Sequence, residues 1–152
     1  MRALIWISAL SLLSGRLGAS LRRPEKSPEE SSYPKIMNLP QWKGFQAQRE
    51  KPLNQVVRDE ESWKSLWGEA SSEKLPEVDF TQFMVVGVFL GLKPTGGYEA
   101  EILEPKVEGK RLVVEYREEN PPPGSFVIQA FTSPYHLMIL PKTDLPVAFR
   151  KI

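Results

Sequence analysis

An uncharged apolar run at residues 84–90 constrains the fold of this chain more than any other feature. The run reads Met-Val-Val-Gly-Val-Phe-Leu, and a loop rich in proline and glycine follows it. Beyond the loop, residues 98–103 alternate between apolar and acidic side chains. An apolar run, a connection and a period-2 alternation predict two β-strands, and their simplest arrangement is an antiparallel hairpin.

The connecting loop contains Pro94, Gly96 and Gly97. Proline presets one φ angle, and glycine adopts positive φ without a steric clash, so these residues suit a plain turn. Thr95 is not required for turning. The segment 94–98 therefore has a second interpretation, as a surface that the two strands present.

Length and composition indicate one globular domain with a hydrophobic core. The chain has 152 residues, of which 41% are hydrophobic, and its formal net charge is +1. A nearly balanced charge without a basic stripe gives no general attraction to nucleic acid. The chain has no cysteine, which excludes disulfides, thiolate metal sites, cysteine nucleophiles and a lipid-modified cysteine.

The first 19 residues have the layout of a secretory signal peptide. A positive start precedes an apolar run at residues 3–13, and Ala19 provides a small residue for cleavage. An uncleaved anchor and a buried N-terminal helix are the alternatives. Residues 20–38 are charged and rich in proline and serine, which predicts a flexible linker. We therefore expect export to the periplasm, cell surface or extracellular space, with no membrane span in the mature chain and one globular domain at residues 39–152.

The first half of this domain contains a predicted strand and a predicted helix. Residues 53–58 resemble a short strand. Asp59 is a candidate N-cap, and a helix from there to about Ala70 would place its apolar residues on one face. These residues are Trp63, Leu66, Trp67 and Ala70. We interpret that face, with both tryptophans, as docked on a sheet rather than as a sugar-binding platform.

The second half alternates strands with rigid connections. A tight turn at residues 107–111 leads into a strand that pairs with the 98–103 strand, and residues 120–124 form a stiff connector with three consecutive prolines. Further strands are expected at 126–132, 135–140 and 147–149. The predicted fold class is α+β, a mainly antiparallel β-sheet arranged as a small sandwich or partly closed barrel, with one amphipathic helix packed on it.

The sequence gives no positive sign of an enzyme. His136 is the one histidine, lies in an apolar strand and is interpreted as a structural side chain. One histidine without cysteine leaves no zinc constellation, and the glycines lack the motif of a phosphate-binding loop. Glu99 and Glu101 are two apart, which alternation explains as a solvated strand face. No cofactor or metal is expected.

Three preorganised loops remain as candidates for binding, because a rigid loop loses little entropy when it binds. Tyr98 and Tyr135 are candidate anchors, with the alternative that they are core residues. The candidate partner-binding residues are Pro94, Thr95, Gly96, Gly97, Tyr98, Pro134, Tyr135 and His136.

A series of motifs resembles the PrcB C-terminal-domain family. The motifs are Trp63 with Leu66-Trp67, Pro76 with Val78-Asp79-Phe80, Val85-Val86 with Phe89-Leu90-Gly91, Pro94-Thr95-Gly96-Gly97-Tyr98 with Ile102, and Thr132 with Pro134-Tyr135-His136-Leu137. The resemblance extends from about Leu53 to the C-terminus. It implies an exported protein of a bacterial envelope that supports a protease partner, although many members have a lipoprotein cysteine that this chain lacks.

The leading expectation is an exported, non-enzymatic module that stabilises or regulates a partner protein, with a protease as the indicated partner. One alternative is a protease inhibitor that inserts the loop 94–98 into a cleft. That loop is similar to the Asn-Pro-Thr-Thr-Gly-Tyr loop of chagasin-type inhibitors, although it lacks the Asn and has Gly for the second Thr. The other alternative is a glycan- or cell-wall-binding module that uses exposed aromatic side chains.

Overall fold

The computed structural model describes residues 39–152. The expected signal peptide at 1–19 and the expected linker at 20–38 lie outside the described residues. The described part contains eight strands and one helix. They are β1 (Gln41–Gly44), β2 (Leu53–Val57), α1 (Glu60–Ala70), β3 (Phe83–Phe89), β4 (Glu99–Ile102), β5 (Lys106–Glu108), β6 (Arg111–Glu119), β7 (Tyr135–Pro141) and β8 (Val147–Lys151).

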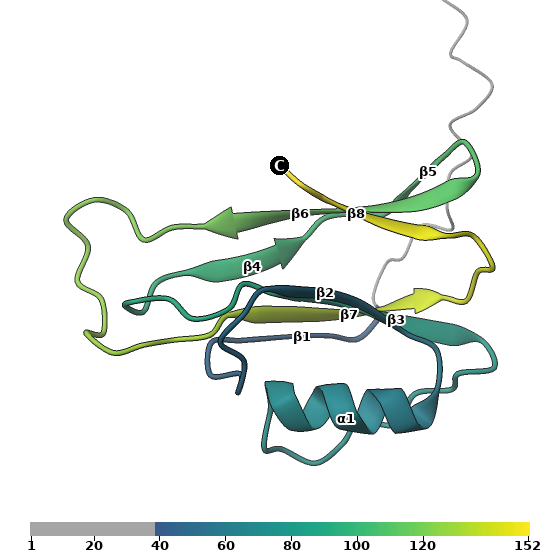
Figure 1. Ribbon diagram of the computed structural model, residues 1–152, viewed down its shortest axis with the longest axis horizontal. Helices are drawn as coiled ribbons and strands as arrows, with labels where there is room; N and C mark the ends of the chain where they lie inside the picture. The colour runs from purple at the N-terminus through teal and green to yellow at the C-terminus, as the bar shows by residue number, and fades with distance from the viewer. Residues whose placement is uncertain (1–38) are drawn as a thin grey trace, which may run out of the picture.

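The strands form two sheets that pack face to face, with α1 against the outer face of one of them (Figure 1). The first sheet has the strand order β1-β7-β3-β2, and all its pairs are antiparallel. In the second sheet β6 pairs antiparallel with β4 and β5, and parallel with β8. The sheets do not close on one another. The expected α+β class is therefore confirmed, in its sandwich form.

Strand β3 is buried on both faces. Val85 and Phe89 belong to the hydrophobic cluster between the first sheet and α1. Met84, Val86 and Val88 belong to the cluster between the two sheets. An uncharged run at this position is required because neither face of β3 meets water.

The predicted hairpin between the 84–90 run and the 98–103 strand is wrong. β3 pairs with β2 and β7, whereas β4 pairs with β6 in the other sheet. The loop between them carries the chain from one layer to the next. The physical reason is a difference in burial. Both faces of β3 are apolar, whereas β4 is apolar on one face only. Two strands paired in one hairpin would have the same neighbours above and below the sheet, so they would be buried on the same faces.

Helix α1 begins and docks as the sequence predicts. The Asp59 carboxylate accepts a hydrogen bond of 2.8 Å from the Ser62 amide, which satisfies one of the free N–H groups of the first turn. Trp63 and Trp67 are buried, and each indole N–H donates a 2.9 Å hydrogen bond to a backbone carbonyl. Trp42 of β1 lies 5.4 Å and 5.5 Å from them, measured between ring centroids.

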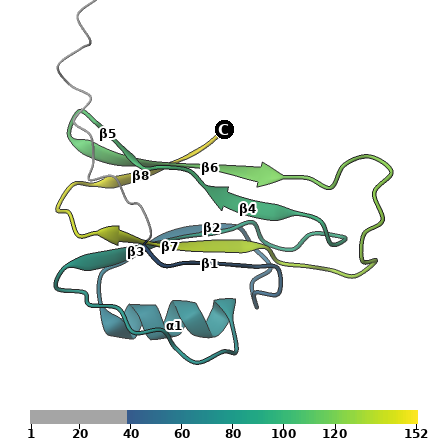
Figure 2. The same ribbon diagram turned by 180° about the vertical axis from the view of Figure 1, so that it is seen from behind.

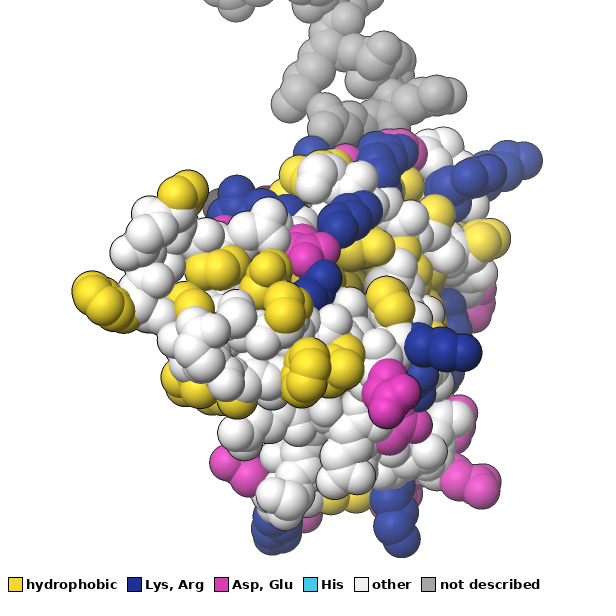
Figure 3. Space-filling model, turned by 60° about the vertical axis from the view of Figure 1, so that its left-hand side comes forward, with side chains coloured by type: hydrophobic (Ala, Val, Ile, Leu, Met, Phe, Trp, Pro, Cys, Tyr) yellow, Lys and Arg dark blue, Asp and Glu magenta, His cyan; other side chains and the backbone are white. Residues whose placement is uncertain are grey.

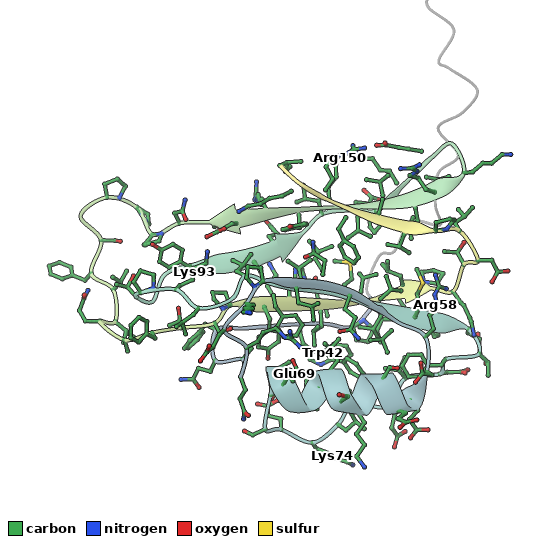
Figure 4. The ribbon with its side chains drawn as sticks, in the orientation of Figure 1. Trp42, Arg58, Glu69, Lys74, Lys93 and Arg150 are labelled. Carbon is green, nitrogen blue, oxygen red and sulfur yellow. The ribbon has the colours of Figure 1, made fainter. Side chains whose placement is uncertain are left out.

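These three tryptophans form part of the core between α1 and the first sheet, with Trp42 half-buried (Figure 4). Two of the three rings have no face open to solvent. Trp63 and Trp67 therefore do not form a sugar platform.

The second sheet is built around β6. β4 pairs with its C-terminal half and β5 with its first residues, joined through a turn in which Gly109 adopts a φ of 59°. The predicted pairing of the 98–103 strand with the strand after the turn is confirmed. No helix within residues 39–152 is long and apolar enough to cross a membrane.

The strand predicted at 126–132 is wrong, because residues 120–134 form a long connection from β6 to β7. Apart from a single bridge between Thr132 and Lys93, this apolar stretch has no neighbouring strand to pair with. A short apolar run is compatible with a strand but does not indicate whether a partner strand covers it.

Candidate binding surface at the loop end of the sandwich

Three connections meet at one end of the sandwich, which we call the loop end (Figures 1 and 2). They are residues 45–52 between β1 and β2, residues 90–98 between β3 and β4, and residues 120–134 between β6 and β7. The third projects farthest beyond the sheets in both views.

Backbone hydrogen bonds tie the three connections together. Lys93 and Thr132 exchange two of them, with N···O distances of 2.7 and 3.0 Å. Ser133 donates to the Phe45 carbonyl at 2.8 Å, and its own carbonyl accepts from the Ala47 amide at 3.1 Å. Gly96 donates to the Ile128 carbonyl at 2.8 Å. These bonds fix the loops relative to one another before any partner arrives.

Two buried hydroxyls add to this framework. The Thr132 hydroxyl donates to the Thr95 carbonyl at 2.7 Å, and the Ser133 hydroxyl donates to the Arg49 carbonyl at 2.6 Å. Both residues are buried. A buried hydroxyl needs a partner to offset its desolvation, and here the partners are carbonyls of the neighbouring connections.

Large apolar side chains are exposed at the loop end. Phe126 is fully exposed, Phe131 is 74% exposed and Ile128 is 64% exposed. Phe45 and Leu92, from the other two connections, are each about half exposed. We call these five residues the apolar patch, and Figure 3 shows hydrophobic side chains gathered on this side of the molecule.

The apolar patch accounts for nearly all the large hydrophobic side chains that residues 39–152 expose. The one outside it is Ile152, at the end of the chain. Single exposed apolar residues are ordinary, but their concentration on one surface marks an interaction site. The loop end is therefore the candidate binding surface.

Charge is absent from the connection that carries most of the apolar patch, whereas the 45–52 connection contains Arg49, Glu50 and Lys51. Residues 120–141 contain no Asp, Glu, Lys or Arg. Lys93 forms an ion pair with Glu118 and lies 5.5 Å from the centre of the Tyr98 ring (Figure 4). Burial raises the pKa of Glu118, but hydrogen bonds from Lys151 and Lys93 outweigh it and leave that pKa below its ordinary value. The Lys93 charge is thus matched within the protein.

The first group of predicted site residues lies at the loop end but not at its tip. Pro94 and Gly97 are exposed, whereas Gly96 is buried beneath the 120–134 connection. A Cβ atom on Gly97 would lie 2.8 Å from Pro121 and 2.9 Å from Val127. The loop 94–98 is therefore packed against its neighbour and does not project as the inhibitor alternative requires.

The second group of predicted site residues needs a correction at Pro134 and His136, whereas Tyr135, although largely buried, lines a surface cleft. Pro134, Tyr135 and His136 are all buried. The Tyr135 ring stacks on Phe89 with 5.8 Å between centroids. His136 is 1% exposed and has no surface to offer a partner, because β7 is an inner strand whose side chains fill both hydrophobic clusters.

His136 instead connects the two sheets. Its Nδ1 accepts a 2.7 Å hydrogen bond from the Ile102 amide of β4, and its Nε2 lies 2.9 Å from the Gln41 side-chain oxygen. This pairing fits a neutral ring that carries its proton on Nε2. Burial, with a smaller effect of Lys43, lowers the pKa of His136 to about 4, and Glu101 opposes that shift.

Sequence reasoning missed the exposed apolar side chains of residues 126–131, because it placed them in a strand. The available signal was the flanking sequence, since three prolines precede this stretch and Pro134 follows it. Proline removes a donor from a sheet ladder, so an apolar run between such residues is a candidate for a loop. No group of three or more His, Cys, Asp or Glu within residues 39–152 is placed to hold a metal ion.

A comparison with protein-family models bears on these residues. Residues 84–141 match the family model described as PrcB C-terminal. The match confirms the family resemblance for this segment. The matched segment runs from β3 through β7, so it contains the central strands of both sheets and two of the three connections of the loop end. Neither a search of curated proteins nor a search of solved structures found a match.

Proposed function

We propose that this chain is an exported, non-enzymatic module that binds a partner protein through the apolar patch and thereby stabilises or regulates it. The family match suggests a domain related to a protease complex, so a protease is the partner class we propose. The signal-like layout of residues 1–19 supports the export part of this proposal.

The apolar patch is the observation that carries this proposal. Aromatic and large aliphatic side chains at the centre of an interface supply most of its binding energy. Phe126 and Phe131 extend from a connection that is hydrogen-bonded to both neighbouring loops. A surface that is already ordered loses less conformational entropy on association than a disordered segment does.

Substitution of the two exposed phenylalanines tests the proposal. Tagged protein of residues 20–152 would be exposed to an envelope extract of the cell that makes it, and captured proteins would be quantified by mass spectrometry. We expect Phe126→Ser with Phe131→Ser to lower capture of the partner at least tenfold. Loss of one hot-spot side chain raises a binding free energy by about 2 kcal/mol or more, and about 1.4 kcal/mol corresponds to a factor of ten.

Ile152→Ser is the matched control. Ile152 is 62% exposed, so this variant also removes an exposed large apolar side chain, but away from the loop end. Capture should be unchanged. Equal capture of the same protein by the double variant and the wild type would contradict binding through the apolar patch.

A further inference from the structure

A cleft opens between the end of β1 and the start of β4. Its volume is about 290 Å³. The aromatic residues Phe45, Tyr98 and Tyr135 line it, together with Lys43, Gly44, Glu99 and Ala100. Pockets for whole drug-sized ligands occupy about 300–1,000 Å³, so this cleft is of a size for one or two side chains. Phe45 belongs to the apolar patch, which makes the cleft continuous with that surface.

The backbone of β1 offers hydrogen bonds on its outer side. The amide of Ile139 donates to the Pro40 carbonyl at 3.1 Å, and Trp42 lies opposite Leu137 in the register of β1 and β7. Because the bonding direction alternates along an antiparallel strand, Trp42 turns its N–H and C=O toward β7. Lys43 therefore turns its N–H and C=O outward, beside the cleft.

The backbone of β4 also has N–H and C=O groups that face the cleft, from the side opposite β1. Leu103 donates to the Glu115 carbonyl at 2.8 Å, which is a bond toward β6. The Ile102 amide points away from β6 and donates to His136. By the same alternation, the N–H and C=O of Ala100 face away from β6, toward the cleft. Among residues 39–152 no strand pairs with the outer edge of β1 or of β4.

A cleft with outward backbone groups on two sides and aromatic rings between them matches the chemistry of an extended peptide. Such a peptide alternates its side chains, so one would enter the ring-lined cleft while its neighbours face solvent. The Lys43 ammonium lies 3.9 Å from a Glu101 carboxylate oxygen. Glu99 also lines the cleft, so the rim carries one carboxylate beside the Lys43–Glu101 pair, and the apolar side chain would enter between the aromatic residues.

We propose that this cleft receives an extended segment of the partner protein, which adds as a strand along the outer edge of β1 and places one apolar side chain among Phe45, Tyr98 and Tyr135. This inference deepens the proposed function and rests on it. The partner would contact the apolar patch and continue into the cleft through Phe45.

Lys43→Pro tests the strand addition, because proline removes an outward N–H without breaking a bond to β7. Asn54→Pro is the matched control. Asn54 lies on β2, at the opposite edge of the same sheet, and alternation turns its amide outward too. Lys43→Ala separates the loss of the side chain from the loss of the amide. Thermal unfolding of each variant reports whether the fold is kept.

The probe is the strongest-binding peptide selected from a random nine-residue library on wild-type protein of residues 20–152. A second copy of the peptide carries N-methyl groups on alternate backbone nitrogens. We expect Lys43→Pro to weaken binding at least tenfold, Asn54→Pro and Lys43→Ala to change it less than twofold, and the N-methylated peptide not to bind wild-type protein.

The inference is overturned if no peptide is selected, if Lys43→Pro binds the peptide as the wild type does, or if the N-methylated peptide binds equally. A wild-type dimer in solution that Lys43→Pro separates would also overturn it, because the occupant would then be a second copy of this chain. Partner capture that depends on Phe126 and Phe131 but not on Lys43 would leave the proposed function intact and remove only this inference.

Discussion

At the scale of single residues, His136 explains how a lone histidine is held in an apolar strand. It is neutral, 1% exposed and hydrogen-bonded to both Ile102 and Gln41. A protonated ring would have no lone pair on Nδ1 for the Ile102 amide. The residue therefore links the two sheets only while it is uncharged.

This role predicts a loss of stability on mild acidification. Above its ordinary pKa of 6.5 the ring is neutral in both folded and unfolded chains. Below that pH His136 binds a proton in the unfolded chain but stays neutral in the folded protein, where its pKa is about 4. Acidification from about pH 7.5 to about pH 5 should lower the free energy of unfolding by about 2 kcal/mol, at about 1.4 kcal/mol per pKa unit. Urea denaturation at both pH values measures this change in the free energy of unfolding.

His136→Leu is the control for this effect. It leaves the Ile102 amide without an acceptor, so we expect it to be less stable than the wild type at neutral pH by about 1–3 kcal/mol. Its stability should no longer fall between the two pH values. A variant that keeps the full acid-induced loss would show that another group causes it.

At the scale of elements, the loop 90–98 depends on its contact with residues 120–134. Gly97 adopts a φ of 86°, and an added Cβ would lie within 3 Å of both Pro121 and Val127. Gly97→Ala should therefore lower the free energy of unfolding by about 1–3 kcal/mol.

Gly68→Ala supplies the contrast for this prediction. Gly68 lies in the exposed part of α1, and no atom is within 4 Å of an added Cβ. Alanine is favoured over glycine in a helix, so this variant should gain about 0.5–1 kcal/mol. Denaturation of both variants, side by side, measures the difference. Equal effects of the two substitutions would argue against close packing at Gly97.

The elements also differ in how far the sequence predicts them. Helix α1 was predictable because its cap and apolar face are local features, and so was the pairing of β4 with β6. The pairing of β3 was not, because its neighbours β2 and β7 are far away in the chain. The apolar run at 126–131 was misleading because a strand forms only where a partner strand bonds to it, which the run itself does not reveal.

At the scale of the whole molecule, the sandwich gathers three connections that are distant in sequence. Backbone bonds join the 45–52, 90–98 and 120–134 connections, and one surface carries the apolar patch. The sequence pointed to the loop 94–98 as part of this region. It did not indicate the exposed phenylalanines, because exposure depends on how both sheets and all three connections come together.

The rest of the surface differs in chemistry from the loop end. Ion pairs link strands of the second sheet, such as Arg150 with Glu108 and Glu115, and Arg117 with Glu101 (Figure 4 labels Arg150). Exposed pairs of this kind contribute little stability but keep that face solvated. The 120–134 connection, by contrast, has no charged side chain and carries three of the five residues of the apolar patch. This difference gives the molecule one side suited to an interface.

The most direct test of binding through the apolar patch is site-specific photo-crosslinking in the living cell. A photoreactive phenylalanine analogue would replace Phe126 in one strain and Ile152 in another, and adducts would be identified by mass spectrometry. Binding through the apolar patch should give one defined protein adduct from position 126 that is absent from position 152. No protein adduct from position 126, or the same adduct from both positions, would contradict it.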